Sequence, residues 1–302
     1  MEKGMVLALG FFDGVHCGHM QLLRKTIEIA EEKHLIPGVL TFENHPLTVI
    51  FPEKAPLLLT DNEEKIALLN EAGIEKIILT PFTTELMQLS PEDFIHCFLL
   101  KNYPVRHIVV GYDYSFGYKG KGNVKDLKAI GKNSQFGVSV IPPYQIDHQK
   151  VCSTMIRNRI LNGNVADIPE CLGRYYSVSG RVIHGKALGR KFGIPTANIC
   201  VSSQKVLPDN GVYYSKITYN NKTYDGLTNI GYNPTFENHP FSVETYIYDF
   251  DEDIYDETVT VTFIRKQRDE IKFSSLDELI RQIRKDIHII DEFRKNMPEV
   301  AP

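Results

Sequence analysis

The spacing of apolar positions divides this chain into two halves. In the first half, short apolar runs alternate with segments whose apolar residues recur every three or four positions. The runs predict buried strands at 6–9, 37–42, 76–79, 107–110 and 138–141, and the periodic segments predict helices at 20–32, 63–71, 91–99, 124–136 and 153–161. Strands that alternate with helices are typical of a parallel sheet flanked by helices. We therefore expect a Rossmann-like α/β domain in this half.

The second half has a different texture. Beyond residue 163, β-branched and aromatic segments are separated by Gly, Asn and Asp turns, and they predict strands at 175–183, 211–219, 222–230, 242–248 and 257–268. Asn220 and Asn221 fit a hairpin turn. The segment 276–295 has one apolar face and predicts a last helix. We expect an antiparallel β-barrel with a terminal helix, and we place the two domains at 1–170 and 171–302.

Composition and charge narrow the class of protein. The 302 residues are 42% hydrophobic, which is enough for two buried cores. A net charge of −4 gives no electrostatic reason to expect a nucleic-acid partner. We find no signal peptide and no run near the roughly 18 apolar residues of a membrane helix. Five cysteines without a CxxC pair favour free thiols in a reducing compartment, so we expect a cytoplasmic protein.

The densest polar motif, Gly-Phe-Phe-Asp-Gly-Val-His-Cys-Gly-His at 10–19, joins the first predicted strand to the first predicted helix. Such a turn directs backbone N–H groups and the positive end of a helix dipole at a phosphate. His16 and His19 are three residues apart, so both imidazoles can donate hydrogen bonds to a phosphate during transfer. Two alternatives are a pair of zinc ligands, for which no third ligand is evident nearby, and a capped helix with a purely structural glycine turn.

Three further segments of the first half carry candidate chemistry. Residues 41–46 place a Glu and a His after the second strand, and residues 111–117 combine aromatic rings with the carboxylate of Asp113. Ser153 and Thr154 begin a predicted helix with Arg157 one turn later, a set that can hold a phosphate and neutralise its charge. Taken singly, each segment is equally well explained by ordinary loop packing or helix capping.

In the second half, residues 185–198 form a glycine-rich segment that ends in Pro-Thr-Ala-Asn. Glycines allow a backbone to approach phosphates closely, and Thr196 and Asn198 supply hard oxygen ligands for Mg²⁺. The spacing is not that of a Walker loop. A flexible hairpin is the alternative. Glu244 lies on a predicted strand, where a lone glutamate usually faces solvent.

In these motifs the chain resembles the bacterial bifunctional riboflavin kinase/FAD synthetase family over nearly its whole length. The first half matches the FMN adenylyltransferase module at 10–19, 42–46, 111–117 and 153–157. The second half matches the riboflavin kinase module at 185–198, 207–213, 229–236, 243–245 and 268–273. The combination is far more specific than any one of the segments.

The resemblance implies two reactions. The C-terminal half would phosphorylate riboflavin with ATP to FMN, and the N-terminal half would join AMP from ATP to FMN, giving FAD and pyrophosphate. His16, His19 and Arg157 would stabilise phosphate charge in the second reaction. Glu244 would take a proton from the terminal ribityl hydroxyl in the first, and Thr196 and Asn198 would hold Mg²⁺ with ATP.

The remaining site residues also follow from the resemblance. ATP and phosphate contacts are expected at Gly10, Phe12, Asp13, Gly14, Gly18, Ser153, Thr154, Gly185, Gly189 and Gly193, and flavin contacts at Asp113 and Phe116. The expected partners are the small molecules riboflavin, FMN and ATP, with neither nucleic acid nor membrane. The protein itself is expected to be a monomer or a weak oligomer.

Two other functions stay open at this stage. The chain departs from the usual family pattern mainly in its first half, at Asn44, Tyr112, Tyr114, Cys152 and Met155, and once in its second half, at Asp256. A chain in which only the kinase half is active, with a weakened or flavin-binding N-terminal half, is therefore an alternative. A flavin-responsive protein without enzymatic activity is a third reading.

Overall fold

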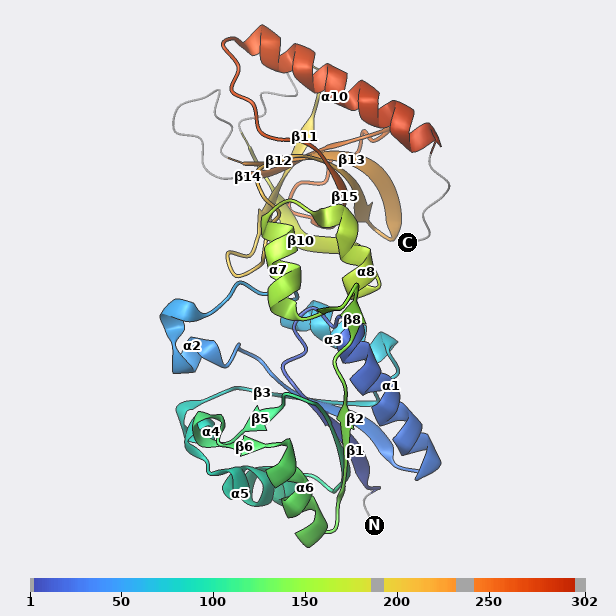
Figure 1. Ribbon diagram of the computed structural model, residues 1–302. Coiled ribbons are helices and arrows are strands. Elements are labelled where there is room, and N and C mark those ends of the chain that lie inside the picture. Colours follow the sequence, from blue (N-terminus) through green and yellow to red (C-terminus); the bar gives the residue numbers. More distant parts are fainter. Residues whose placement is uncertain (1–2, 186–192, 232–241, 297–302) are drawn as a thin grey trace. The chain divides into compact units, whose positions relative to one another are not determined.

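The computed structural model describes residues 3–185, 193–231 and 242–296, and the chain divides into two compact units, Met1–Ser153 and Thr154–Pro302 (Figure 1). The segment that follows Ser153 packs with the barrel of the second unit, where the Asp209 amide donates to the Ile160 carbonyl at 3.3 Å. The expected domain boundary after residue 170 stays a prediction. Each unit is described by itself below.

The N-terminal unit contains the predicted parallel sheet. Its strands run β3-β2-β1-β4-β7, and their bounds are β1 Met5–Leu9, β2 Ile36–Phe42, β3 Lys76–Thr80, β4 Val105–Gly111 and β7 Gly137–Ile141. The chain reverses its direction of winding between β1 and β4. In such sheets ligands bind outside the carboxyl ends of the strands at this switch point. The turn at 10–16 and the loop at 111–117 both begin there.

Both faces of this sheet are covered, as the alternation along β1 shows. Val6 and Ala8 belong to the core under α1, with Leu23 and Ala30, whereas Leu7 contributes to the core on the opposite face. The helices are α1 Cys17–Glu32 and α3 Asn62–Glu71 on the first face, and a π-helix, Phe94–Leu100, and α6 Val124–Asn133 on the second (Figure 1). Because both faces of the sheet are packed, the ends of the strands are fixed in position, and so are the starts of the loops that follow them.

Several elements differ from the predicted ones. The helix expected at 91–99 begins as α5, Pro91–Asp93, and continues as the π-helix. Helix α6 ends at Asn133 rather than 136, because Gln135 adopts a positive φ of 61° that ends helical hydrogen bonding. Short elements that the pattern did not predict are α2 Leu47–Ile50, the 3₁₀ turns Pro52–Lys54 and Tyr118–Gly120, α4 Thr84–Gln88, and the small strands β5 Ser115–Phe116, β6 Gly122–Asn123, β8 Gln145–Ile146 and β9 Gln149–Lys150.

The C-terminal unit is the predicted antiparallel barrel. Its closed order is β10-β11-β14-β13-β12-β15, with β10 Tyr176–Ile183, β11 Thr196–Val201, β12 Gly211–Tyr219, β13 Lys222–Gly231, β14 Ser242–Ile247 and β15 Thr258–Arg268. Asn220 and Asn221 both have positive φ, at 47° and 60°, as the expected two-residue hairpin turn requires. Strand β11 was missed, because its residues were interpreted only as the end of a glycine-rich loop.

Helices close this unit at two places. Helix α7 Ser153–Leu161, the 3₁₀ turn Val165–Asp167 and α8 Ile168–Leu172 precede the barrel. The terminal helix α10, Leu276–Asn296, lays Ile287, Ile290 and Phe293 on a barrel cluster that includes Val212 and Tyr214. The predicted terminal helix is therefore confirmed, and its apolar face packs against the barrel.

Candidate functional site

The turn after β1 is held in an unusual backbone conformation. Phe12, Gly14 and Val15 have positive φ values of 56°, 81° and 39°. Glycine adopts this region freely, but a bulky aromatic or β-branched residue does so only when its surroundings impose it. Such imposed strain gathers at functional sites. Gly14 and the strained residues beside it therefore indicate that the rest of the fold holds this turn in its conformation.

Asp13 is one source of that constraint. Its side chain is only 3% exposed, and Oδ1 accepts hydrogen bonds from the Leu59 amide at 2.9 Å and the Thr60 amide at 3.1 Å. The Thr60 hydroxyl in turn accepts from the Gly14 amide at 3.0 Å. Asp13 therefore ties the turn to the segment before α3. The structure thus gives Asp13 a structural role. Its contact with ATP stays a prediction.

His16 and His19 lie together, as the spacing predicted. His16 is the N-cap of α1, its Nδ1 accepts from the His19 amide at 3.2 Å, and the two rings stack with centroids 3.6 Å apart. Burial, and then the nearby His16, lower the pKa of His19 well below 6.5. His19 is therefore neutral at physiological pH, and its ring can donate one N–H. A Cβ at Gly18 would stand 3.1 Å from the His16 ring, so the glycine leaves room for this stack.

The residues at the start of α7 divide between the two units. Ser153 belongs to the N-terminal unit, and its hydroxyl donates to the Asp13 carbonyl at 3.0 Å, so it touches the turn. Thr154 is exposed and Arg157 is buried on α7 in the other unit. The phosphate contacts predicted for these three residues stay predictions.

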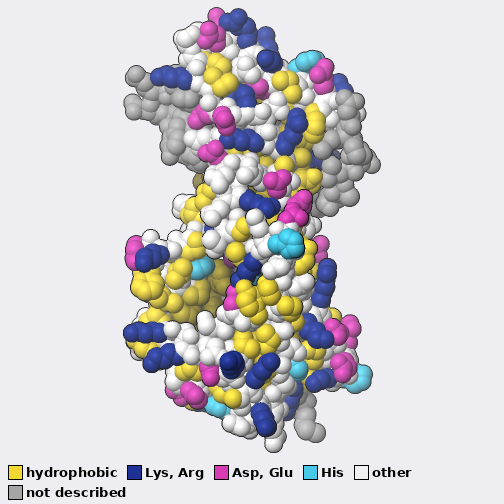
Figure 2. All heavy atoms as spheres, in the orientation of Figure 1, with side chains coloured by type: hydrophobic (Ala, Val, Ile, Leu, Met, Phe, Trp, Pro, Cys, Tyr) yellow, Lys and Arg dark blue, Asp and Glu magenta, His cyan; other side chains and the backbone are white. Residues whose placement is uncertain are grey.

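The two candidate flavin residues of the loop after β4 differ in their exposure. Asp113 is exposed and pairs with Lys150 at 2.5 Å, and Lys150 also lies 4.9 Å from the Tyr112 ring centroid. Phe116 is only 6% exposed and packs in the core beside Phe94. The packing gives the Phe116 ring a structural role, and its contact with flavin stays a prediction. Figure 2 shows hydrophobic side chains gathered over the α2 segment, where Ile50 and Phe51 are exposed.

In the C-terminal unit, three polar side chains meet across neighbouring strands. Asn198 of β11 is the register partner of Glu244 of β14, which is also the partner of Asn229 of β13. Paired residues of antiparallel strands point to the same face, and Thr196, two positions before Asn198, shares it. Glu244 also accepts a hydrogen bond from the Ser242 hydroxyl at 3.0 Å. The predicted ligands and base therefore lie together, and Asn229 is an addition that the motif pattern left without a role.

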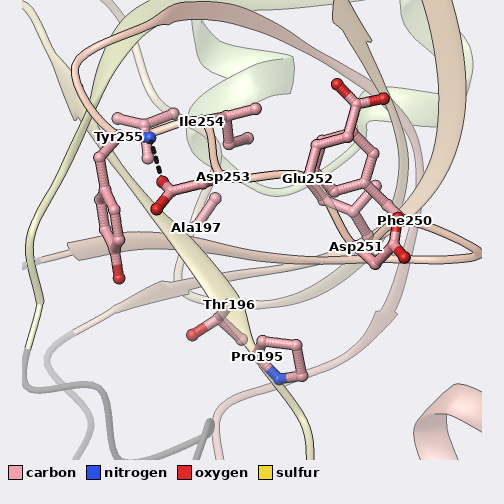
Figure 3. A pocket seen from close by; sticks show the side chains of 11 residues that line it. Pro195, Thr196, Ala197, Phe250, Asp251, Glu252, Asp253, Ile254 and Tyr255 are labelled. Atoms are coloured by element: carbon pink, nitrogen blue, oxygen red, sulfur yellow. Dashed lines mark hydrogen bonds between the residues drawn. The ribbon is translucent and has the colours of Figure 1, made fainter.

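Two cavities are lined by residues of this polar group. A cavity of about 360 Å³ is lined by Pro195, Thr196 and Ala197 of β11 and by residues 250–255 (Figure 3). A smaller one of about 110 Å³ is lined by Thr196, Asn229 and Glu244 together with apolar residues, among them Leu227, Ile271, Phe273, Leu279 and Ile283. Thr196 lines both. One cavity with an acidic rim and one with an apolar wall thus share an edge at Thr196, and Glu244 lines the apolar one.

The glycine-rich segment is only partly described. A Cβ at Gly185 would collide with the Asn198 side-chain amide, so the backbone passes directly against this candidate ligand. Gly193 has a positive φ of 72° and open space around it. Gly189 and the motif residues 232–236 lie outside the described residues.

The donor set suits Mg²⁺ better than zinc. Thr196 and Asn198 offer a hydroxyl and an amide oxygen beside the Glu244 carboxylate, and hard oxygen donors of this kind bind magnesium, which keeps much of its water or substrate shell. Within the described residues, no three His, Cys, Asp or Glu side chains gather as a metal site. The residues present therefore fit a cation that arrives with ATP.

Comparisons with known proteins match the two halves of the chain to two different families. Residues 1–155 match the family model for FAD synthetase, and residues 172–294 match the model for riboflavin kinase. Among the described residues, no helix combines the length and the apolar character needed to cross a bilayer.

Curated relatives cover both halves. A protein of Listeria monocytogenes is 38% identical over 93% of this chain and 90% of its own length, and one of Escherichia coli K12 is 34% identical over 97% and 93%. Both are named bifunctional riboflavin kinase/FMN adenylyltransferase. A crystal structure from Streptococcus pneumoniae, titled macrolide-efflux protein, is 32% identical with a TM-score of 0.87 over 99% of this chain and 96% of that one. By its sequence and by both of its halves, the chain belongs to the bifunctional riboflavin kinase/FMN adenylyltransferase family.

Proposed function

We propose that this chain catalyses two consecutive reactions of flavin cofactor synthesis. Its C-terminal unit transfers the γ-phosphoryl group of ATP to riboflavin, and its N-terminal unit transfers AMP from a second ATP to the resulting FMN, releasing pyrophosphate. The observation that carries this proposal is the match of each half to its own family, with relatives that carry both activities in their names. The third reading, a protein without enzymatic activity, is not favoured.

In the kinase step, Glu244 acts as general base. It takes the proton of the terminal ribityl hydroxyl while the oxygen attacks the γ-phosphorus and ADP leaves. Register pairing with Asn198 supports this role, because it places the base beside the residues proposed to hold the nucleotide. Riboflavin is proposed for the apolar cavity and ATP for the larger one, so that donor and acceptor meet at Thr196. Bound Mg²⁺ would neutralise phosphate charge, with Thr196 and Asn198 as its protein ligands.

In the adenylyl step, an FMN phosphate oxygen attacks the α-phosphorus of ATP and pyrophosphate leaves. His16, His19 and Arg157 are proposed to stabilise the charge on the phosphates, and no covalent enzyme intermediate is needed. A neutral His19 can fill this role, because one ring nitrogen of a neutral imidazole carries an N–H that donates a hydrogen bond. Backbone N–H groups at the start of α1 supply further donors.

The finer expectations belong to the same proposal. We propose a cytoplasmic monomer or weak oligomer whose ligands are riboflavin, FMN, FAD and ATP, with no nucleic-acid partner. The five cysteines form no disulfide in the described part of the chain, which supports a reducing compartment. Phosphate contacts at Gly10, Phe12, Asp13, Gly14 and Gly18, and a flavin contact at Asp113, are likewise proposed.

A chromatographic time course tests both activities at once. Purified protein is given riboflavin, ATP and Mg²⁺, and riboflavin, FMN and FAD are resolved. FMN followed by FAD is the expected result. FMN that accumulates without FAD would leave a riboflavin kinase with a silent N-terminal half, and no turnover of riboflavin would refute the proposal. A second reaction, started from FMN and ATP, measures pyrophosphate release by the N-terminal unit alone.

A further inference from the structure

A buried lysine lies under the nucleotide turn and has no role in the mechanism above. Lys65, on α3, is only 2% exposed. Lysines are almost never buried to this extent unless their charge is compensated, because an isolated ammonium is strongly disfavoured away from water. The neighbours of Lys65 should therefore explain why it is there.

Those neighbours belong to the two segments that frame the N-terminal site. The Lys65 ammonium donates to the carbonyl of Phe42, the last residue of β2, at 2.8 Å. It also lies 4.6 Å from the centroid of the Phe11 ring, within range of a cation–π contact. The opposing charge is that of Asp13, which acts on the pKa of Lys65. One ammonium thus contacts the end of β2 and the Phe11 ring of the strained turn, and the charge of Asp13 acts on it from the same turn.

Phe11 carries this contact further into the turn. Its carbonyl accepts from the Thr41 hydroxyl at 2.8 Å, and its ring meets the His45 ring edge-on at a centroid distance of 4.7 Å. Phe11 is therefore held by Lys65 and by residues on either side of Phe42. His45 comes from the segment at 41–46 whose polar residues the two reactions leave without a role.

We propose that Lys65 is a positioning residue for ATP in the N-terminal unit, whose ammonium fixes Phe11 and compensates part of the charge of the buried Asp13 carboxylate, so that the turn accepts a polyphosphate. This inference rests on the proposed adenylyl transfer. Without the ammonium, the negative charge of Asp13 would be less well compensated beside the backbone groups offered to the phosphates. Like charges at short range in a partly buried site repel strongly, so the first consequence is weaker binding of ATP.

The ionisation of Lys65 makes this role visible in the pH dependence. Burial lowers its pKa from 10.5 to about 8, and Asp13 opposes that shift. Among the other charged or titratable groups nearby, Glu43 and His45 follow β2 and Glu64 precedes Lys65 on α3, but Asp13 is the one whose charge acts on the lysine. Above pH 8 the ammonium loses its proton, and its share of the compensation of Asp13 is lost. The KM for ATP in adenylyl transfer should therefore rise with pH through about 8.

Stability should change in the opposite direction. Because the folded pKa lies below the unfolded value of 10.5, the unfolded chain binds more protons between about pH 8 and 10.5. The contribution of Lys65 to the free energy of unfolding therefore increases with pH across this window, as burial of the charge is relieved. A loss of ATP affinity over the same window therefore cannot come from a loss of stability through Lys65, and a merely structural lysine would not produce it.

The test measures the KM for ATP and kcat of adenylyl transfer from pH 6.5 to 9.5 for the wild type, Lys65→Met, Lys65→Arg and an exposed-lysine control, Lys128→Met on α6. The wild type should show a rise of about tenfold in KM, with an apparent pKa near 8. Lys65→Met should have the raised KM at every pH, and Lys65→Arg should keep the low KM to pH 9.5. Lys128→Met should follow the wild type. Riboflavin kinase activity, measured in the same samples, reports the amount of intact C-terminal unit, and the N-terminal transition in calorimetry reports whether the fold around Lys65 is intact.

Each alternative outcome counts against the proposal. A wild-type KM that does not change through pH 8, or Lys65→Met and Lys65→Arg variants that are equally impaired, would overturn it. A fall in kcat with unchanged KM would assign Lys65 a different role. If the wild type releases no pyrophosphate from FMN and ATP at neutral pH, the proposed adenylyl transfer itself fails, and the role of Lys65 fails with it.

Discussion

Asp286 links the terminal helix to the wall of the kinase cavity, and its charge can be removed with little change of shape. It is 2% exposed on α10. Its Oδ2 accepts from Arg268 Nε at 2.9 Å and Nη2 at 2.7 Å, and its Oδ1 accepts from Gln282 Nε2 at 2.9 Å. Both ends of the ion pair line the smaller cavity. Asp286→Asn keeps the volume and removes the charge, leaving the Arg268 guanidinium without its partner.

The expected loss of stability depends on how far Asp286 and Arg268 are each buried. Two unit charges about 4 Å apart interact by about 4 kcal/mol at the effective dielectric constant of a partly buried site. Removing one partner of a buried pair typically costs about 3–5 kcal/mol, because the other charge is left uncompensated. Arg268 is 17% exposed and water recovers part of this cost, so we expect about 3 kcal/mol. For a unit of this size, that lowers Tm by about 6–12 °C.

Calorimetry of the full chain and riboflavin kinetics check this prediction together. The C-terminal transition should move, the N-terminal one should stay, and the KM for riboflavin should rise because α10 carries Leu279 and Ile283 of the cavity wall. Asp277→Asn, an exposed acid on the same helix, is the control and should cost under about 1 kcal/mol. The double variant Arg268→Met with Asp286→Leu should recover part of the loss. Equal stability of Asp286→Asn and wild type, or strictly additive double-variant losses, would refute the reasoning.

Three further predictions use the two activities as controls for each other. His19→Ala should slow FAD formation by about 10²–10³-fold and spare FMN formation, which a time course started separately from FMN and from riboflavin measures. Glu244→Gln should slow FMN formation by about 10²–10⁴-fold and leave adenylyl transfer from added FMN intact; equal loss of both activities in either variant would argue against separate sites. Because the folded pKa of His19 lies below its unfolded value of 6.5, the N-terminal unit should lose stability as pH falls below about 6.5, and His19→Gln should show a shallower loss in urea unfolding.

The sequence predicted most elements because each carried its own periodic signal. Strand β12 was predicted with the observed bounds, and the hairpin turn at 220–221 followed from residues that tolerate positive φ. Strand β11 was missed for a local reason. It begins after a proline, directly behind the glycine-rich segment, and only Ala197 and Ile199 are buried in its short alternation, so pairing with β10 and β14 defines it more clearly than its pattern does. The π-helix was missed because its apolar spacing does not distinguish it from an α-helix.

The candidate sites were predictable where motif and contact coincide, and otherwise not. His16 and His19 are neighbours in sequence and in space, so spacing alone brought them together. Phe116 illustrates the opposite case, because a motif position occupied by an aromatic residue does not reveal whether the ring faces a ligand or the core. Lys65 carried no signal at all, since a lysine on a polar helix is ordinarily solvated. Its burial depends on Phe11 and Phe42, which are 54 and 23 residues away in the sequence.

Both units must hold polar and charged side chains at a site proposed for phosphates, and they do so with different parts of their folds. In the barrel, the polar residues stand on paired strands, so the register between Asn198 and Glu244 sets their separation and the ladder of main-chain hydrogen bonds keeps it. In the parallel sheet, the site residues lie on loops that follow the strands. A loop has no ladder of its own, so contacts with other segments must fix its conformation. Asp13 does this through Leu59 and Thr60, but it brings a buried negative charge to a site proposed for phosphates. We propose that the Lys65 ammonium, on α3, compensates part of this charge.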